Sequence, residues 1–388
     1  MTTIAACLLL LLAPAEPITP SSLQDALLVP PRGESAEALA ARIRAAFPKD
    51  HDLKTGGHLV EKDAVAFVVE APAEPAPRVT GMVDHSRGLD LVKIGDTGLW
   101  ARVESIPTDT KFAYNFTAGG KPFGDKTVEM PDWSYPADSK ERPGVTYSSY
   151  NVFKIAGPPF NNGHTGWIYA PAAYDPKTPA ALMVFQDGDA YKGEHVGRVV
   201  DNLIAAKAMP VTILVGLNPG TKDGKSNRSV EYDTLSDKYA TFLDAQILPM
   251  VKKEYNISDD PSKHAIVGAS SGGICAFTVA WHRPDLFGRV CSQIGSFTNI
   301  RGGNAYPEIV RKADKKPIKV LLTDGTNDLI NDHGDWWQAN EAMFAALTAK
   351  GYDVHFLKDR GFHAYWTCGR QLPEALRWLW ADGEKTAK

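Results

Sequence analysis

The stretch HAIVGASSGG, residues 264–273, decides the fold of this chain. It contains the pattern G-x-S-x-G centred on Ser270, in which a strand enters a very tight turn and a helix leaves it. Small residues flank the serine because the turn is strained and the chain passes close to its neighbours. We therefore predict a strand over His264–Gly268, a helix over Ser271–His282 and a nucleophilic serine between them. The alternative interpretation is a glycine-rich turn without a chemical role.

Apolar segments alternate with helical patterns on both sides of this stretch, and two antiparallel strands, Tyr147–Ile155 and Gly166–Ala170, precede them. The other strands are expected at Ala181–Gln186, Val211–Leu217, Arg289–Ile294, Ile318–Thr323 and Val354–Leu357, and the other helices at Val196–Lys207, Ser236–Tyr255, Ala339–Lys350 and Gln371–Asp382. Strands that alternate with helices predict βαβ units. The fold class is therefore α/β, with a mostly parallel sheet that carries helices on both faces.

The residues before this region have a different pattern. A short helix is expected at Ala36–Phe47, and short strands follow one another from about residue 62 to residue 130. Short strands at this spacing predict a small β-sandwich. A segment rich in proline and aromatic residues, Met130–Asp138, is typical of a linker. We place the first domain at residues 21–140 and the α/β catalytic domain at residues 146–384.

Length and composition agree with two globular domains. The chain has 388 residues, and a domain takes about 150. Hydrophobic residues make up 44% and charged residues 23%, which is ordinary for a globular protein. The 42 basic and 46 acidic residues give a net charge of −4, which argues against a nucleic-acid partner. This balance also gives no reason to expect binding to an anionic membrane surface.

The first residues are typical of an export signal. The apolar run Ile4–Ala15 is too short to span a membrane, and Ala13–Ala15 has the small-x-small pattern of a cleavage site. We predict a signal peptide at residues 1–15 and a secreted or periplasmic protein. The alternative is a buried N-terminal helix of a cytosolic protein.

The cysteines do not indicate a metal or redox motif. The four thiols, Cys7, Cys275, Cys291 and Cys368, form no CxxC pair. Cys275 and Cys291 lie in apolar segments and are expected to be buried thiols. No metal-ligand spacing and no phosphate-binding loop occurs, so no metal and no cofactor is implied.

A nucleophilic serine needs a base and an orienting acid. In α/β-hydrolases they follow in the order serine, acid, histidine. His363 lies in a loop just past the last predicted strand, which makes it the candidate base. The acid is expected after the preceding strand. Asp328 lies deep enough in that loop to fold back, and the alternatives there are Asp324, interpreted as a turn former, Asp332 and Asp335.

The oxyanion formed by nucleophilic attack needs backbone N–H donors. The N–H of the residue after the nucleophile, Ser271, is one expected donor. The second should come from the loop after an early strand, where Gly188 permits a turn and the N–H of Asp189 follows it. The alternative is an ordinary Asp-Gly turn.

Other residues are candidates for contacts with a substrate. Arg228 and Glu231 are expected to form an ion pair near the site, with a substrate role as the second possibility. The aromatic side chains of Trp336, Trp337, Tyr365 and Trp366 lie in the loops of the acid and the base. They are expected either to form a platform for an aryl group or a sugar ring, or to anchor these loops.

Several further motifs follow one another in a recognisable order. They are Phe185–Tyr191 (FQDGDAY), Asn227–Tyr232 (NRSVEY), Ile247–Pro249, the serine motif, Asp324–Asp328 (DGTND), Gly361–His363 and Leu372–Leu379. Residues 146–382 resemble the family 1 carbohydrate esterases, which include feruloyl and acetylxylan esterases, and the related enterochelin esterases. The segment upstream resembles an Ig-like, early-set module. Two positions depart from the family pattern, because Phe362 replaces a glycine and Gln246 replaces a glutamate.

The resemblance implies a serine hydrolase with the triad Ser270, Asp328 and His363. We expect a carboxylic ester hydrolase that acts through an acyl-enzyme on feruloyl or acetyl esters of plant polysaccharide, or on related small esters. The alternatives are a siderophore esterase, an acyltransferase, and a carbohydrate-binding protein with an idle hydrolase domain. The sequence leaves the oligomeric state open.

Overall fold

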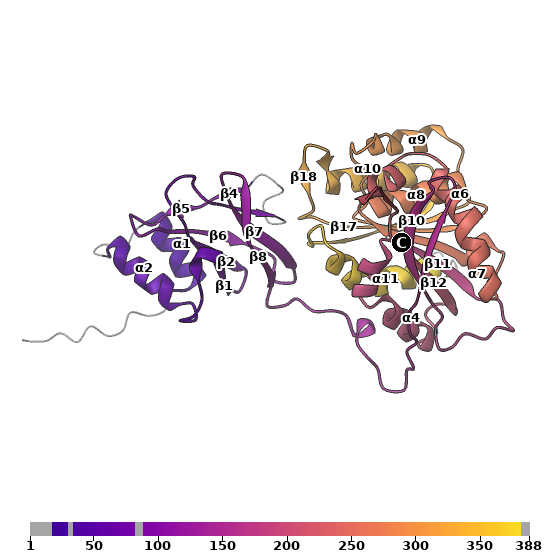
Figure 1. Ribbon diagram of the computed structural model, residues 1–388, viewed down its shortest axis with the longest axis horizontal. Helices are drawn as coiled ribbons and strands as arrows, with labels where there is room; N and C mark the ends of the chain where they lie inside the picture. The colour runs from indigo at the N-terminus through magenta and orange to yellow at the C-terminus, as the bar shows by residue number, and fades with distance from the viewer. Residues whose placement is uncertain (1–17, 30–33, 82–87, 382–388) are drawn as a thin grey trace, which may run out of the picture. The chain divides into compact units, whose positions relative to one another are not determined.

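The chain forms two compact units in the computed structural model, which describes residues 18–29, 34–81 and 88–381 (Figure 1). The smaller unit takes in the described residues up to Thr108 and Ala113–Pro131, and the larger one takes in Asp109–Phe112 and the described residues from Asp132 on. The predicted signal peptide, residues 1–15, lies outside the described residues.

The smaller unit contains two helices and two antiparallel sheets. The helices are α1 (Pro20–Leu28) and α2 (Ala36–Ala45). One sheet has the order β1 (Gly57–Glu61), β2 (Ala64–Glu70), β6 (Leu99–Ser105), β5 (Val92–Lys93), and the other has the order β4 (Leu89–Asp90), β3 (Arg78–Gly81), β7 (Lys111–Ala118), β8 (Lys121–Glu129). The rings of Phe67 on β2 and Tyr114 on β7 meet edge to face, with centroids 4.7 Å apart, so the two sheets pack on each other. The resemblance to an Ig-like module stays a prediction.

The larger unit is built on one central sheet. Its order is β14 (Lys225–Ser226), β13 (Thr221–Lys222), β10 (Asn162–Tyr169), β12 (Thr212–Leu217), β11 (Ala181–Gln186), β15 (His264–Ala269), β16 (Arg289–Gln293), β17 (Lys319–Gly325), β20 (Asp353–Asp359), and β9 (Asn151–Gly157) also pairs with β10. The strands from β12 to β20 run parallel. The prediction of a mostly parallel sheet is confirmed.

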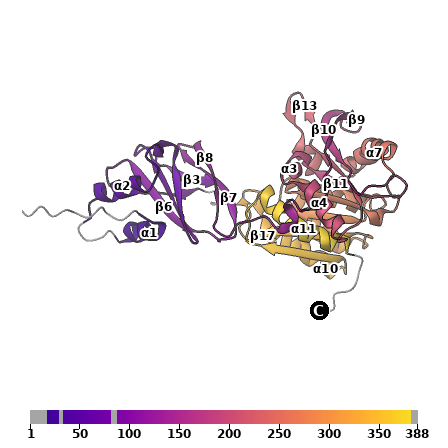
Figure 2. The same ribbon diagram turned by 90° about the horizontal axis from the view of Figure 1, so that it is seen from below.

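Helices cover both faces of this sheet, as expected (Figure 2). On one face lie α6 (Lys238–Phe242), α7 (Leu248–Glu254), α8 (Ser271–His282), α9 (Tyr306–Lys312) and α10 (Trp336–Ala349), and on the other α3 (Gly188–Gly193), α4 (Val196–Ala205) and α11 (Tyr365–Trp380). The strands are apolar on both sides because both sides are covered. All residues of β11, β12 and β15 are buried.

One predicted helix is interrupted. The sequence predicts a single helix over Ser236–Tyr255, but a π-helical segment, Leu243–Ile247, separates α6 from α7. Pro249 lies in the first turn of α7 and has no N–H to continue the helical ladder, so the preceding turn widens.

Three cysteines lie in the described part of the chain. Cys275, Cys291 and Cys368 are buried and carry no disulfide.

In the parts of the chain that the structure describes, no helix combines the length and the apolar character needed to cross a membrane.

Candidate active site

Ser270 lies on a strained turn between β15 and α8. Its backbone has φ 59° and ψ −124°, a left-handed conformation that residues with side chains rarely adopt. The turn also brings backbone segments into close approach. A Cβ atom on Gly268 would lie 2.1 Å from the carbonyl oxygen of Gly272, so only glycine fits. The strand, turn and helix therefore form as the sequence pattern predicts.

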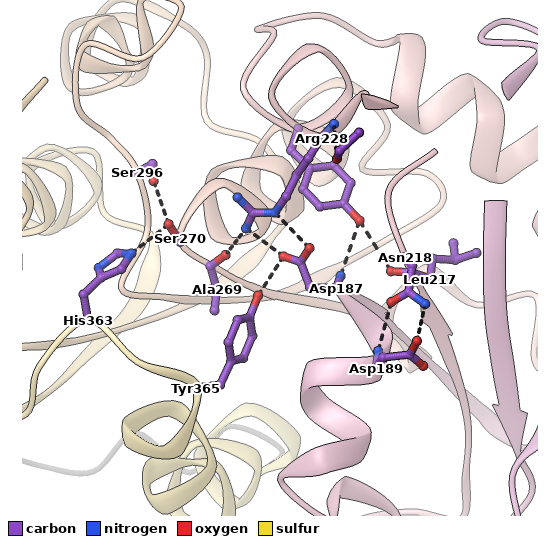
Figure 3. Close-up of polar contacts among 12 residues, drawn as sticks. Asp187, Asp189, Leu217, Asn218, Arg228, Ala269, Ser270, Ser296, His363 and Tyr365 are labelled. Carbon is purple, nitrogen blue, oxygen red and sulfur yellow. Dashed lines mark hydrogen bonds and ion pairs between the residues drawn. The ribbon is translucent and has the colours of Figure 1, made fainter. Parts of the chain in front are cut away.

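The structure brings Ser270, His363 and Asp328 together. His363 Nε2 lies 2.8 Å from Ser270 Oγ, and its Nδ1 lies 2.5 Å from Asp328 Oδ1 (Figure 3 shows the first contact). The carboxyl ends of parallel strands meet at one edge of a sheet, so the loops after β15, β17 and β20 converge there. The arrangement can pass a proton from the serine hydroxyl to the imidazole.

Burial sets the protonation of His363. Removal from water disfavours the charged imidazole and lowers the pKa of His363 to about 4. The ring is therefore neutral at pH 7. Its contact with the Asp328 carboxylate assigns the ring proton to Nδ1, which leaves Nε2 as the acceptor facing Ser270.

A second carboxyl group, Asp324, lies behind Asp328. It is completely buried on β17 and shares a hydrogen bond with Asp328. The Asn340 amide donates to Asp324 Oδ2 at 2.8 Å and the Gly325 N–H donates to Oδ1 at 2.7 Å. Burial raises the pKa of both carboxyl groups, that of Asp328 to about 7 and that of Asp324 well above its ordinary value. The neighbouring carboxylate of Asp328 adds to the rise at Asp324, so the proton of the pair is held on Asp324 and Asp328 carries the charge. Asp324 is therefore a buried partner of the acid, whereas the sequence suggests a turn former.

The two N–H groups that the sequence suggests as oxyanion donors, those of Ser271 and Asp189, have different hydrogen-bonding environments. Ser271 begins α8, and the first N–H groups of a helix have no partner within the helix. The N–H of Asp189, by contrast, donates to Asn218 Oδ1 at 3.0 Å, and Asn218 Nδ2 donates back to Asp189 Oδ2 at 2.7 Å (Figure 3). The expectation for Asp189 is corrected, because this side-chain amide occupies its N–H.

Arg228 pairs with a different carboxylate from the one expected. Its Nε donates to Asp187 Oδ1 at 2.9 Å and its terminal nitrogen donates to Oδ2 at 2.8 Å. The Tyr365 hydroxyl donates to the same Oδ2 at 2.7 Å (Figure 3). These three side chains form one wall of a pocket of about 430 Å³ beside Ser270. It is lined by Asp187, Ala190, Asn218, Arg228, Ser270, Ile294, His363, Ala364 and Tyr365.

The Glu231 carboxylate is buried among hydrogen-bond partners from the protein itself. Glu231 is 2% exposed, and its carboxylate lies 3.0 Å from His164 Nε2. The carboxylate also accepts hydrogen bonds from Asn162, Asn227 and the N–H of Gly220. The predicted Arg228–Glu231 ion pair is therefore wrong. The carboxylate is fully engaged by the protein and does not face the pocket.

None of the three tryptophans lines the pocket. Trp336 is 2% exposed, donates its Nε1–H to Ser296 Oγ at 3.1 Å and meets the His363 ring with centroids 5.6 Å apart. Trp337 packs on Phe356 with centroids 5.6 Å apart. The Trp366 Nε1–H donates to the Lys111 carbonyl at 2.8 Å. The contacts of these three tryptophans fit the loop-anchor alternative, whereas Tyr365 lines the pocket.

Sequence reasoning missed Asn218, Ser296 and the role of Asp187. Asp187 lies inside a motif that the sequence singles out, and its left-handed φ of 54° marks it as an unusual position. Asn218 and Ser296 carry no local signal, because only the tertiary fold brings them close to Ser270.

Comparisons with known proteins identify the family of this chain. Residues 159–379 match the family model "Esterase", described as "Putative esterase". The iron(III) enterobactin esterase of Dickeya dadantii is 24% identical over 230 residues, which cover 55% of this chain and 51% of that protein. The endo-1,4-beta-xylanase/feruloyl esterase of Xylanibacter ruminicola is 22% identical over 344 residues, or 81% of this chain and 44% of that one. The chain thus spans about half the length of these two relatives.

A solved structure shows the same fold. The ferric enterobactin esterase of Salmonella typhimurium superposes with a TM-score of 0.65 at 20% identity, covering 84% of this chain and 97% of that one. The α/β-hydrolase fold class is confirmed. The chain belongs to the esterase family that its residues 159–379 match, and it is a carboxylic ester hydrolase.

Proposed function

We propose that the chain hydrolyses carboxylic esters through an acyl-enzyme on Ser270. The observation that carries this proposal is the continuous contact from Ser270 Oγ through the His363 ring to Asp328. His363 takes the serine proton as the Oγ–carbonyl bond forms, and Asp328 holds the ring in the required tautomer. The N–H of Ser271 donates to the oxyanion, an interaction worth about 3 kcal/mol.

The second half of the reaction releases the acid. The tetrahedral intermediate expels the alcohol, to which His363 returns the proton. Water then loses a proton to His363 and attacks the acyl-enzyme, and Ser270 departs with a proton from the same ring. No other group is needed for the proton balance.

We propose a feruloyl or acetyl ester of plant polysaccharide, or a related small ester, as the substrate. Supporting the feruloyl ester, the pocket presents the polar side chains of Asn218, Arg228 and Tyr365, which suit an acyl group that carries oxygen substituents. A catecholate siderophore ester is the second proposal. It is favoured by the relatives and solved structures named enterobactin esterases.

The test compares the wild type with Ser270→Ala on p-nitrophenyl acetate and methyl ferulate. Ser292→Ala is the matched control, because Ser292 is also buried but lies on β16 outside the proposed machinery. We expect the wild type and the control to be active and Ser270→Ala to lose activity. A fluorophosphonate should label Ser270, as found by peptide mass spectrometry. Full activity of a folded Ser270→Ala would refute the proposal.

Two further measurements separate the alternatives. Added alcohol should not outcompete water, and preferential ester synthesis would instead indicate an acyltransferase. Hydrolysis of a catecholate trilactone without hydrolysis of methyl ferulate would favour the siderophore ester. Export, residues 1–15 as a signal peptide and the domain limits 21–140 and 146–384 are also proposals. Mass spectrometry of the N-terminal peptide, on protein isolated from the cells that express it, tests whether the signal peptide is cleaved.

A further inference from the structure

A second hydroxyl group lies against the proposed nucleophile. Ser296 Oγ is 3.3 Å from Ser270 Oγ (Figure 3). Ser296 follows β16 in the sequence and is completely buried. Its backbone N–H also donates to the carbonyl oxygen of Ser270 at 3.0 Å. The two serines are therefore held together by the backbone as well as by their side chains.

The direction of the contact follows from donor and acceptor chemistry. The Trp336 Nε1–H lies 3.1 Å from Ser296 Oγ, and an indole N–H can only donate. Ser296 Oγ therefore accepts this bond, and its own proton must go to another acceptor. On the other side, Ser270 directs its proton to the unprotonated Nε2 of His363, 2.8 Å away.

One arrangement satisfies all of these groups. We propose that the Ser296 hydroxyl donates a hydrogen bond to Ser270 Oγ, and that Trp336 is the positioning residue that fixes this direction. The inference rests on the proposed function, since it assigns a role at the oxygen that attacks and later leaves. Trp336 thereby acts from behind the site and makes no contact with substrate.

The added bond acts where charge develops on Ser270 Oγ. In acylation the Oγ–H bond breaks toward His363 while the Oγ–C bond forms. In deacylation the Oγ–C bond breaks, its electron pair returns to Oγ, and the proton comes back from His363. The proton of Ser296 stays on Ser296 throughout. A donor placed before the reaction begins stabilises the partial negative charge on Oγ in both steps.

The burial of Trp336 keeps this donor in place. The indole is 2% exposed and its ring meets the His363 ring edge to face. Asp335 caps α10 by accepting from the Gln338 N–H at 3.0 Å, which fixes the start of the helix that carries Trp336. The indole is thus held in the position from which its N–H reaches Ser296 Oγ.

The test is a double-mutant cycle on the full chain with p-nitrophenyl acetate. The variants are Ser296→Ala, Trp336→Phe and the double variant, with Ser292→Ala as the matched control and Ser270→Ala run beside them. We expect Ser296→Ala to lower kcat about tenfold with KM within twofold, from the lost bond to a developing charge. Trp336→Phe keeps an aromatic ring beside His363 but removes the N–H, so kcat should also fall. The double variant should be no slower than Ser296→Ala, since both changes break one chain.

The outcomes separate the two proposals. A folded Ser296→Ala with wild-type kcat overturns this inference while an inactive Ser270→Ala still supports the proposed function. Multiplicative losses in the double variant also overturn it, because they indicate independent packing effects. If Ser296→Ala does not fold, Ser296→Cys replaces the hydroxyl by a thiol, which has a similar size and is a weak hydrogen-bond donor. A wild-type kcat in Ser296→Cys would also overturn this inference. An active Ser270→Ala overturns both proposals.

Discussion

Arg228 holds Asp187 through two parallel hydrogen bonds, with nitrogen–oxygen distances of 2.9 and 2.8 Å, at the wall of the pocket that contains Ser270. The Asp187 carboxylate also accepts a hydrogen bond from the Tyr365 hydroxyl and is largely shielded from water. Its side chain is 12% exposed, and its backbone adopts a left-handed conformation. The pair therefore fixes the pocket wall by joining the residue that starts α5 (Arg228–Tyr232) to the loop after β11.

Removal of the guanidinium should destabilise the fold. In Arg228→Met the Asp187 carboxylate stays partly buried without its charged partner, and we expect unfolding to be easier by about 2 kcal/mol. Arg228→Lys should lose less, since one bond can remain. Urea unfolding measures both. Arg198→Met is the control, because its partner Glu141 is 74% exposed and the pair should contribute under about 1 kcal/mol. Equal stability of the two methionine variants would contradict the assignment.

The two buried aspartates should behave differently. Asp328→Asn removes the group that fixes the His363 tautomer, and we expect kcat to fall by about 10,000-fold. Asp324→Asn replaces a neutral acid by a neutral amide and should cost far less. Steady-state kinetics on p-nitrophenyl acetate compares them. The reverse order would make Asp324 the orienting acid, which is the alternative that the sequence also allows.

The pH dependence follows from the buried histidine. Below its pKa the imidazole is protonated and cannot accept the Ser270 proton, so a lowered pKa moves the acid limb of activity to lower pH. Burial lowers the pKa of His363 to about 4, and we expect the midpoint of the acid limb of kcat/KM to fall below the value of about 6.5 for free imidazole. Rates from pH 4 to 9, corrected for Ser270→Ala, give the midpoint. A midpoint at 6.5 or above would refute the expectation.

Glu231 should matter for stability and leave substrate affinity unchanged. Its side chain and that of His164, which lie in contact, are both fully buried. Glu231→Ala leaves four polar partners without an acceptor and should cost about 3 kcal/mol or more. Glu308→Ala, at a glutamate side chain that is 58% exposed, is the control. A rise in KM without a loss in unfolding free energy would restore the substrate role that the sequence suggests.

The sequence predicts those parts of the site that depend on local rules. The turn at Ser270 follows from the spacing of small residues. The positions of His363 and Asp328 follow from chain order on parallel strands. Each of these rules involves only neighbours in sequence or the common edge of a sheet, so no tertiary detail is needed.

Other features depend on partners distant in sequence. Arg228 lies three residues from Glu231, yet it binds Asp187, which follows β11 and is distant in sequence. The N–H of Asp189 is occupied by Asn218 from the loop after β12. An aromatic residue in a loop has the same sequence signature whether it lies in a pocket or behind it, and Trp336 lies behind it. The π-helical segment before Pro249 likewise depends on how the chain accommodates a missing N–H.

The left-handed backbone of Ser270 places this enzyme in a trade-off between activity and stability. A residue with a side chain held in such a conformation costs about 1–3 kcal/mol, which glycine would not incur. Ser270→Gly should therefore unfold at a higher denaturant concentration than the wild type while having no nucleophile, whereas Ser270→Ala keeps the strain. Selection for thermal robustness alone would drive this position away from serine, and only the need for turnover retains it.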